Sequence, residues 1–139
     1  MNERVVVRHG DLQTAQTPVL AGINDSRAHH FDPAHRSDPR QALLGAPPDA
    51  PVCVLLAHQP RSAQAALAAG FDLQLSGHTH GGQFWPWNLF VPLKQPFTAA
   101  LNRLQNLWVY TSRGTGYWGP PRRFGAPSEI TALRLVLAN

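Results

Sequence analysis

Three histidines in two short segments carry most of the chemistry that this sequence offers. His78 and His80 stand two residues apart in the glycine-rich stretch SGHTHGGQ at 76–83, and His58 follows an apolar run at 51–57. A neutral imidazole can give one ring nitrogen to a divalent metal. The glycines allow positive φ and let the backbone approach an ion or a phosphate closely. The pattern therefore predicts a metal site built from His58, His78 and His80.

A strand must precede each histidine segment if the three side chains are to meet. Residues 51–57 are predicted to form a buried parallel strand, because the run is continuously apolar. Ser62 is expected to cap a helix over 63–69, and a second apolar strand then leads to the histidine pair. Since the carboxyl ends of parallel strands meet at one edge of a sheet, both histidine segments are predicted to lie at the same edge.

These segments resemble the calcineurin-like metallophosphoesterases, and within them the bacterial branch related to membrane-associated phosphodiesterases. LLAHQP at 55–60 resembles the single-histidine motif of the family, and GHTH at 77–80 resembles its closing Gly-His-x-His motif. Similarity to the tail of the same branch is seen in SRGTG at 112–116, PRRF at 121–124 and SEIT at 128–131. The resemblance, over residues 18–137, implies an α/β fold: part of an αββα sandwich with mixed sheet strands and short helices.

The resemblance also implies an activity and the residues that serve it. It implies metal-dependent hydrolysis of a phosphoester, as by a phosphodiesterase, at a centre of two divalent ions, with Mn, Fe or Zn as the candidates. His58 and His78 would bind the second ion and His80 the first. Gln83 and Arg113 are the candidate substrate-binding residues, because each sits in a loop that the resemblance places near the site and arginine can pair with phosphate oxygens through two bonds.

The remaining ligand motifs of the family are not found in this sequence. They are Asp-x-His, Gly-Asp-x-x-Asp and Gly-Asn-His-Asp/Glu, and the nearest approach, Gly10-Asp11, has Thr14 at the position of the second aspartate. Without a bridging carboxylate, three neutral imidazoles suit one ion and its water ligands better than two ions. We therefore expect residues 1–139 to be a single partial domain, a truncated carboxyl-terminal half, with weak or no hydrolysis by itself.

A second interpretation is a non-catalytic module. Its histidines would hold one structural ion, while the aromatic stretch FWPWNLFVPL at 84–93 and the arginines bind a partner or a membrane surface, where tryptophan is favoured. The same stretch would otherwise pack over the metal site. A third interpretation is a degenerate gene product that does not fold.

Charge and composition restrict the partners. The 139 residues carry 12 Lys and Arg against 8 Asp and Glu, a modest excess spread along the chain, so nucleic acid is not a predicted partner. Arg113, Arg122 and Arg123 form the densest basic group and suit a phosphoester small molecule or an acidic lipid. A half-sandwich leaves one sheet face open, which favours a homo-oligomer or marginal stability.

The sequence contains no targeting or membrane-spanning signal. No run reaches the roughly 18 apolar residues that span a bilayer, and the first residues lack the apolar core of a signal peptide. These features predict a cytoplasmic or peripheral membrane location. The single cysteine, Cys53, is predicted to be a small core residue.

Four further strands and one helix are predicted from alternation, turns and caps. The strands lie at 5–7, 18–23, 107–111 and 129–137, and the helix runs from Pro39 to Leu44 after Asp38. His29, His30 and His35 are interpreted as histidines of a solvated loop, because no element fixes their geometry.

Overall fold

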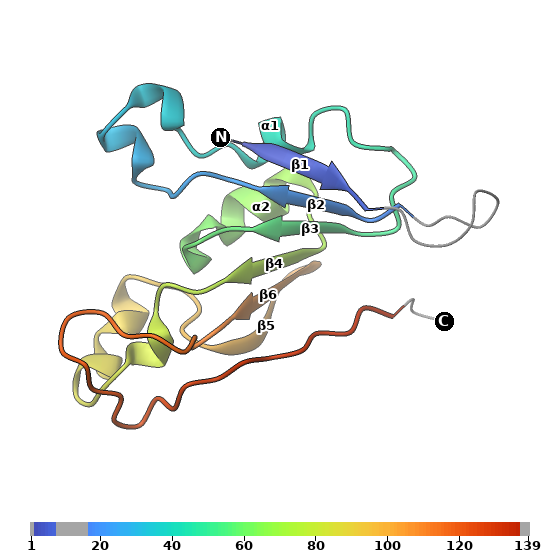
Figure 1. The fold of residues 1–139 in the computed structure, drawn as a ribbon. Helices are drawn as coiled ribbons and strands as arrows, with labels where there is room; N and C mark the ends of the chain where they lie inside the picture. The colour runs from blue at the N-terminus through green and yellow to red at the C-terminus, as the bar shows by residue number, and fades with distance from the viewer. Residues whose placement is uncertain (1, 8–16, 137–139) are drawn as a thin grey trace.

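Four parallel strands form the centre of a mixed six-stranded sheet (Figure 1). The computed structural model describes residues 2–7 and 17–136. Its strands are β1 Glu3–Val6, β2 Val19–Gly22, β3 Cys53–Leu56, β4 Leu73–Ser76, β5 Ala100–Leu104 and β6 Leu107–Thr111. They are ordered β1-β2-β3-β4-β6-β5, with antiparallel strands at both edges. The predicted α/β class with mixed strands and short helices is confirmed.

Two short α-helices and six 3-10 turns connect the strands. The helices are α1 Pro39–Leu43 and α2 Ala63–Ala69, and the turns are η1 Ala28–His30, η2 Pro33–His35, η3 Pro60–Ser62, η4 His80–Gly82, η5 Trp87–Leu89 and η6 Val91–Leu93. The Asp38 side chain accepts a hydrogen bond from the Gln41 amide at 3.0 Å, so it caps α1 as a residue before a helical proline commonly does. α2 ends at Gly70, whose φ of 90° is the left-handed conformation of a helix C-terminus.

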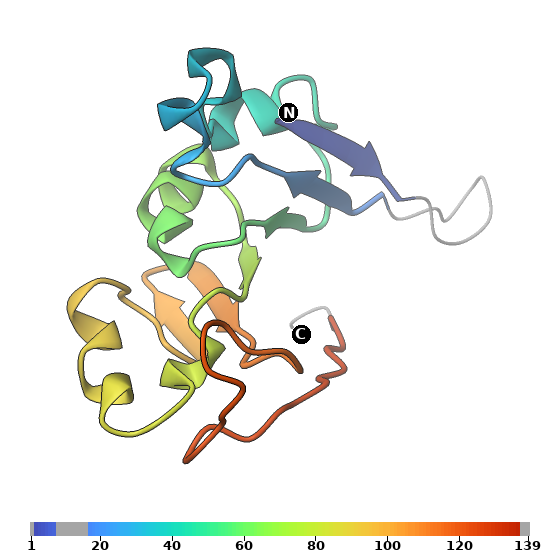
Figure 2. The ribbon, with the colours of Figure 1, turned by 60° about the vertical axis from the view of Figure 1, so that its left-hand side comes forward.

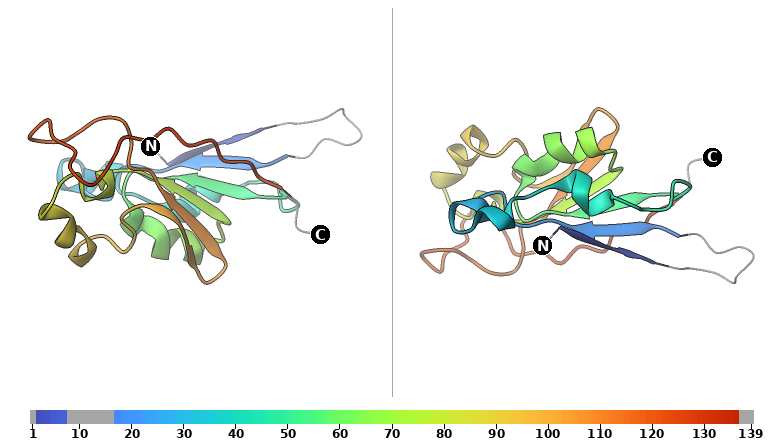
Figure 3. Two further views of the ribbon diagram at one scale, coloured as in Figure 1. Left: turned by 90° about the horizontal axis from the view of Figure 1, so that it is seen from below. Right: turned by 90° about the horizontal axis from the view of Figure 1, so that it is seen from above.

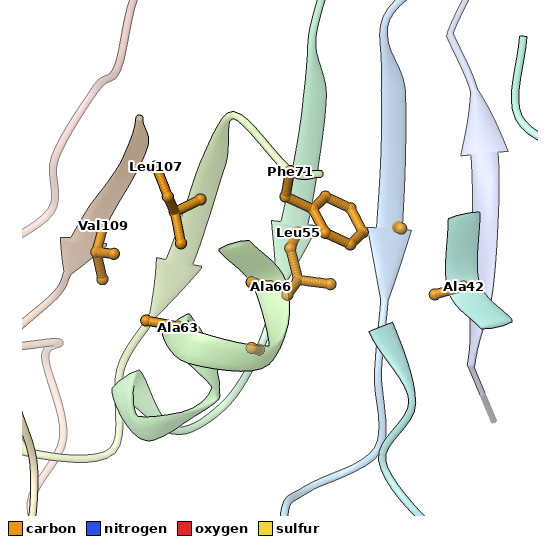
Figure 4. Close-up of a cluster of buried hydrophobic side chains, with 9 residues drawn as sticks. Ala42, Leu55, Ala63, Ala66, Phe71, Leu107 and Val109 are labelled. Atoms are coloured by element: carbon orange, nitrogen blue, oxygen red, sulfur yellow. The ribbon is translucent and has the colours of Figure 1, made fainter. Parts of the chain in front are cut away.

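The hydrophobic core lies between one face of the sheet and the two helices (Figure 4). Its fully buried members are Ala21, Ala42, Leu55, Ala57, Ala63, Ala66, Phe71, Leu107 and Val109. The helices contribute alanines, which let their backbones lie close to the larger strand side chains. Cys53 is partly buried against this cluster, close to its predicted place in the core.

Among the described residues, only the carboxyl-terminal segment covers the opposite face of the sheet, and Figure 3 shows it crossing that face as an extended chain. Large apolar side chains on this face remain exposed, among them Leu56, Leu101 and Trp108. Their alternation with core residues along each strand places them there. The open face expected for a half-sandwich is therefore present, and association of two copies through it stays a prediction.

The strand predicted at 129–137 is wrong over its described residues, 129–136. The segment forms no strand, and Ile130 is 92% exposed. Its contacts with the sheet are side-chain hydrogen bonds, in which the Tyr110 hydroxyl meets Glu129 and Thr131. An apolar, β-branched sequence gains from strand geometry only when a neighbouring strand pairs with it.

The helix cap predicted at Ser62 is also wrong. Ser62 already has helical φ and ψ as the last residue of η3, and its side chain makes no capping hydrogen bond. An N-cap residue must instead be extended to turn its oxygen toward the first amides of the helix. The helix itself keeps its predicted bounds.

The segment with Gly10, Asp11 and Thr14, where the Gly-Asp-x-x-Asp motif of the family was sought, lies outside the described residues. Within the described residues, no helix has both the length and the apolar character needed to cross a membrane.

Candidate metal centre

The structure brings His58 and His78 into direct contact. Nε2 of His58 lies 3.1 Å from Nδ1 of His78, and the two rings meet edge to face with centroids 4.8 Å apart. β3 and β4 are adjacent and parallel, and the Gly77 amide donates to the His58 carbonyl oxygen at 3.1 Å. The two loops therefore begin side by side at one edge of the sheet, as predicted.

The turn after β4 holds three non-glycine residues in the left-handed region. φ is 69° at His78, 51° at His80 and 56° at Gln83. This conformation costs an L-residue roughly 1–2 kcal/mol, so tertiary contacts must hold the turn in shape. Thr79 supplies one such contact, because its buried hydroxyl donates to the Thr98 carbonyl oxygen at 2.7 Å.

The glycines of this turn are required by close approach as well as by φ. Gly81 and Gly82 have φ of 63° and 83°. A Cβ on Gly82 would lie 2.6 Å from the Asn88 backbone, and one on Gly81 would lie 2.8 Å from the Arg113 side chain. The turn therefore packs directly against two later segments of the chain, 87–89 and 112–116.

His80 lies beside the His58–His78 pair but contacts a different part of the molecule. It lines the same pocket as the other two histidines, and its Nδ1 is buried without a hydrogen-bond partner among the described residues. The structure thus joins two of the predicted ligands and places the third nearby. The assignment of all three as ligands stays a prediction.

The surroundings of His78 and His80 favour the neutral form of each imidazole. Burial lowers the pKa of His78, and repulsion from His58 adds to this effect against the attraction of Asp25. Burial also lowers the pKa of His80, and Arg123 adds to this effect while the Gly116 backbone opposes it. Neutral imidazole is the form that binds a metal ion.

The buried side-chain amides of Gln59 and Gln95 form a hydrogen-bonded chain next to the histidines, and this chain ends at Asp25. Gln59 Nε2 donates to both carboxylate oxygens of Asp25 at 3.0 Å, and Gln95 Nε2 donates to Gln59 Oε1 at 3.2 Å. Burial alone would raise the pKa of Asp25, but the Arg27 amide, Gln59 and the nearby histidines together lower it. The sequence does not predict this network, and its one signal for it is the position of Asp25 just after a predicted strand.

Gln83 is buried, and its side chain is hydrogen-bonded to the backbone of the loop after β6. Its side chain is 0% exposed; Nε2 donates to the carbonyl oxygens of Trp118 at 2.7 Å and Pro120 at 3.0 Å, and Oε1 accepts from the Trp118 amide at 2.7 Å. The structure therefore gives Gln83 a positioning contact. Its predicted substrate contact stays a prediction.

Arg113 is half-buried and engaged with Glu129. Its guanidinium lies 3.6 Å from the Glu129 carboxylate, and its backbone amide donates to the same carboxylate at 2.9 Å. Arg123 donates to backbone carbonyl oxygens of five residues, which are Gly116, Arg113, Ala126, Pro127 and His80. Both arginines thus help to assemble the loop beside the histidine turn, and substrate binding by Arg113 stays a prediction.

Glu129 makes the stability of this loop depend on pH. The hydrogen bond from the Arg113 amide lowers the pKa of Glu129 below its ordinary 4.5, although burial opposes it, and Tyr110 and the two arginines add to the effect. Because the folded pKa is depressed, the stabilisation is present above pH 4.5 and is lost as the pH falls through the folded value. We expect Glu129→Gln to reduce the free energy of unfolding near pH 7 by up to about 1 kcal/mol and to flatten its decline in acid.

Urea unfolding between pH 3 and 7 tests this expectation. Glu3→Gln is the matched control, since Glu3 is an exposed glutamate of β1 outside this contact. If the free energy of unfolding of Glu129→Gln depends on pH as it does in the parent chain, Glu129 is not the source of this pH dependence.

The separation of His58 and His78 is compatible with two ligands of a single metal ion. Two imidazole nitrogens that share one tetrahedral Zn at about 2.0–2.1 Å lie roughly 3.3 Å apart, close to the 3.1 Å between His58 and His78. Among residues 2–7 and 17–136, however, no three His, Cys, Asp or Glu side chains form a group that could hold an ion. The pair can thus give an ion two ligands, and further ligands would have to join it.

The chain is similar to several proteins named for a metallophosphoesterase domain. It is 45% identical over 124 residues to a transmembrane protein with metallophosphoesterase domain from Bos taurus, which covers 86% of this chain and 28% of that protein. It is 47% identical over 88 residues to an uncharacterized metallophosphoesterase of Helicobacter pylori, covering 62% and 24% of the two chains. It is 39% identical over 93 residues to phosphodiesterase YaeI of Escherichia coli, covering 60% and 32%.

The matches fall in the carboxyl-terminal part of these relatives. The chain spans about a quarter to a third of the length of the curated relatives it matches. No family model and no solved structure matches it.

Proposed function

Because the chain belongs to the calcineurin-like metallophosphoesterase family, we propose that it forms part of the site of a metal-dependent phosphoester hydrolase. Phosphodiesters are the substrate class that we favour, in line with the name of the Escherichia coli relative. Since the chain spans only part of its relatives, the hydrolytic activity belongs to this proposal.

The contact between His58 and His78 carries the proposal. The two rings extend from the carboxyl ends of neighbouring parallel strands and bring two nitrogens to within 3.1 Å. We propose these two side chains as ligands, with His80 completing the set from the adjacent turn. An ion held there, with Mn, Fe or Zn as candidates, would polarise a phosphate oxygen and lower the pKa of bound water.

Residues around the histidines suit the binding of a phosphate. Arg27, Arg61 and Lys94 line the same pocket, and none of the described residues lining it is acidic. These cations would attract the anion and offset its charge. Two ions held close together would need a bridging carboxylate, which this lining lacks, so we propose that the chain alone hydrolyses phosphodiesters weakly or not at all.

Metal stoichiometry tests the proposal directly. The purified chain is equilibrated with Mn²⁺ or Zn²⁺, freed of excess ion and analysed for metal content, with hydrolysis of bis(p-nitrophenyl) phosphate measured on the same sample. We expect about one ion per chain and little turnover, because the His58–His78 pair suits one ion. Two tightly held ions with rapid turnover would show that a second ion finds ligands elsewhere, and no bound ion would overturn the proposal.

A further inference from the structure

One wall of the pocket at the histidines is apolar and serves no purpose in metal binding. The pocket encloses about 810 Å³, within the usual range for small-molecule sites. Its polar lining includes the three histidines and the cations Arg27, Arg61 and Lys94. Its apolar wall consists of Trp87, Phe90, Val91, Leu93 and Trp118.

The apolar wall is built from two segments that are far apart in sequence. Figure 2 shows the η5–η6 segment in yellow and the loop after β6 in orange-red at the same end of the sheet as the turn after β4. Trp87 joins the two segments, with its ring centroid 5.9 Å from that of Trp118 and 6.0 Å from that of Phe90. Asn88 packs against Gly82 and its amide donates to the Phe84 carbonyl oxygen, which anchors η5 on the histidine turn.

The side chains of this wall are open to contact. Phe90 is 53% exposed and Leu93 is 81% exposed, although both are large and apolar. Gln95 Oε1 accepts a hydrogen bond from the Arg61 amide at 3.2 Å, which ties the chain just after η6 to Arg61. The pocket therefore combines cationic side chains with exposed apolar ones.

We propose that this pocket binds a phosphoester that carries a long apolar substituent. The phosphate group would lie at the imidazoles and the cations, and the apolar group would lie along the wall formed by η5, η6 and Trp118. The proposal rests on the proposed function, because that function places the phosphate at the histidines. The charge of the polar lining selects the anion, and the length of the wall selects the substituent.

Alkyl phosphates of increasing length test this proposal with the full chain. Methyl, butyl and octyl phosphate are titrated below their micelle-forming concentrations into the Mn²⁺-equilibrated protein, and tryptophan fluorescence and calorimetry report binding. Burial of each methylene strengthens binding by up to about fourfold. We expect octyl phosphate to bind at least about tenfold more tightly than butyl phosphate.

Variants of the apolar wall distinguish the dependence of affinity on alkyl chain length from binding of the phosphate group. Leu93→Ser and Phe90→Ser are expected to remove most of the dependence on chain length while leaving methyl phosphate affinity within about twofold, because both side chains lie on the apolar wall. Leu44→Ser is the matched control, since Leu44 is 76% exposed and lies outside the pocket.

The outcomes distinguish this proposal from the proposed function. Equal affinity for methyl and octyl phosphate, or no binding of any alkyl phosphate, would overturn the apolar wall as a substrate site, whatever the metal content of the sample. Absence of bound metal would count against the proposed function alone. Vesicles of phosphatidylglycerol form a separate arm, and binding to vesicles without binding of free octyl phosphate would show that the wall contacts a membrane surface instead.

Discussion

Replacement of His58 or His78 by alanine is expected to weaken binding of Zn²⁺ or Mn²⁺ by about 100-fold or more. Loss of a residue that only supports a metal ligand typically costs 10–100-fold in affinity, and loss of a ligand should cost at least as much. The 3.1 Å separation of the two ring nitrogens makes each a candidate ligand of the same ion, so either substitution leaves a single donor from the pair.

Calorimetric titration with each metal measures this effect, and unfolding by urea checks that the variants fold. Both side chains are largely exposed, so we expect stability to change little. His35→Ala is the matched control, because His35 is exposed in η2 and distant in sequence from the pair. A variant of His58 that binds metal as tightly as the parent chain would contradict the assignment.

Replacement of Gln83 by alanine is expected to lower the free energy of unfolding by about 2–4 kcal/mol. The substitution removes a fully buried side chain and leaves the Trp118 amide and two carbonyl oxygens without their partner. A buried polar group that loses its hydrogen bond costs its full desolvation penalty, and the cavity adds to this cost.

Two measurements distinguish a loss of overall stability from local opening of the loop after β6. Urea unfolding reports overall stability, and hydrogen exchange of the Trp118 amide reports whether the loop after β6 opens by itself. Gln64→Ala is the matched control, because Gln64 is an exposed residue of α2 for which we expect a change within about 0.5 kcal/mol. If Trp118 keeps its protection and stability is unchanged, Gln83 does not hold this loop.

Elements that depend on local signals were predicted closely. The helix at 63–69 and the strand at 107–111 have the predicted bounds, because a terminal Gly70 and a short run of aromatic and β-branched residues act within a few residues. β5 was missed, since Ala100–Leu104 is an edge strand with polar Asn102 and Arg103 and lacks such a run.

The segment 129–136 shows that local composition alone does not decide whether a segment forms a strand. Its composition favours a strand, but the chain passes over the open face of the sheet without a strand partner. Whether a β-forming sequence pairs depends on which strand edge it reaches, and that choice involves residues far away in the chain.

The amino-acid sequence indicates which residues lie at the candidate metal centre, whereas the contacts around them depend on the tertiary structure. His58 and His78 follow apolar strands, and the ends of adjacent parallel strands meet at one edge whatever the loops do. The links from Gln59 to Asp25 and from Gln83 to Trp118 span 34 and 35 residues. Such contacts exist only once the sheet has brought the loops together, because a side-chain amide finds its partner through packing and not through spacing along the chain.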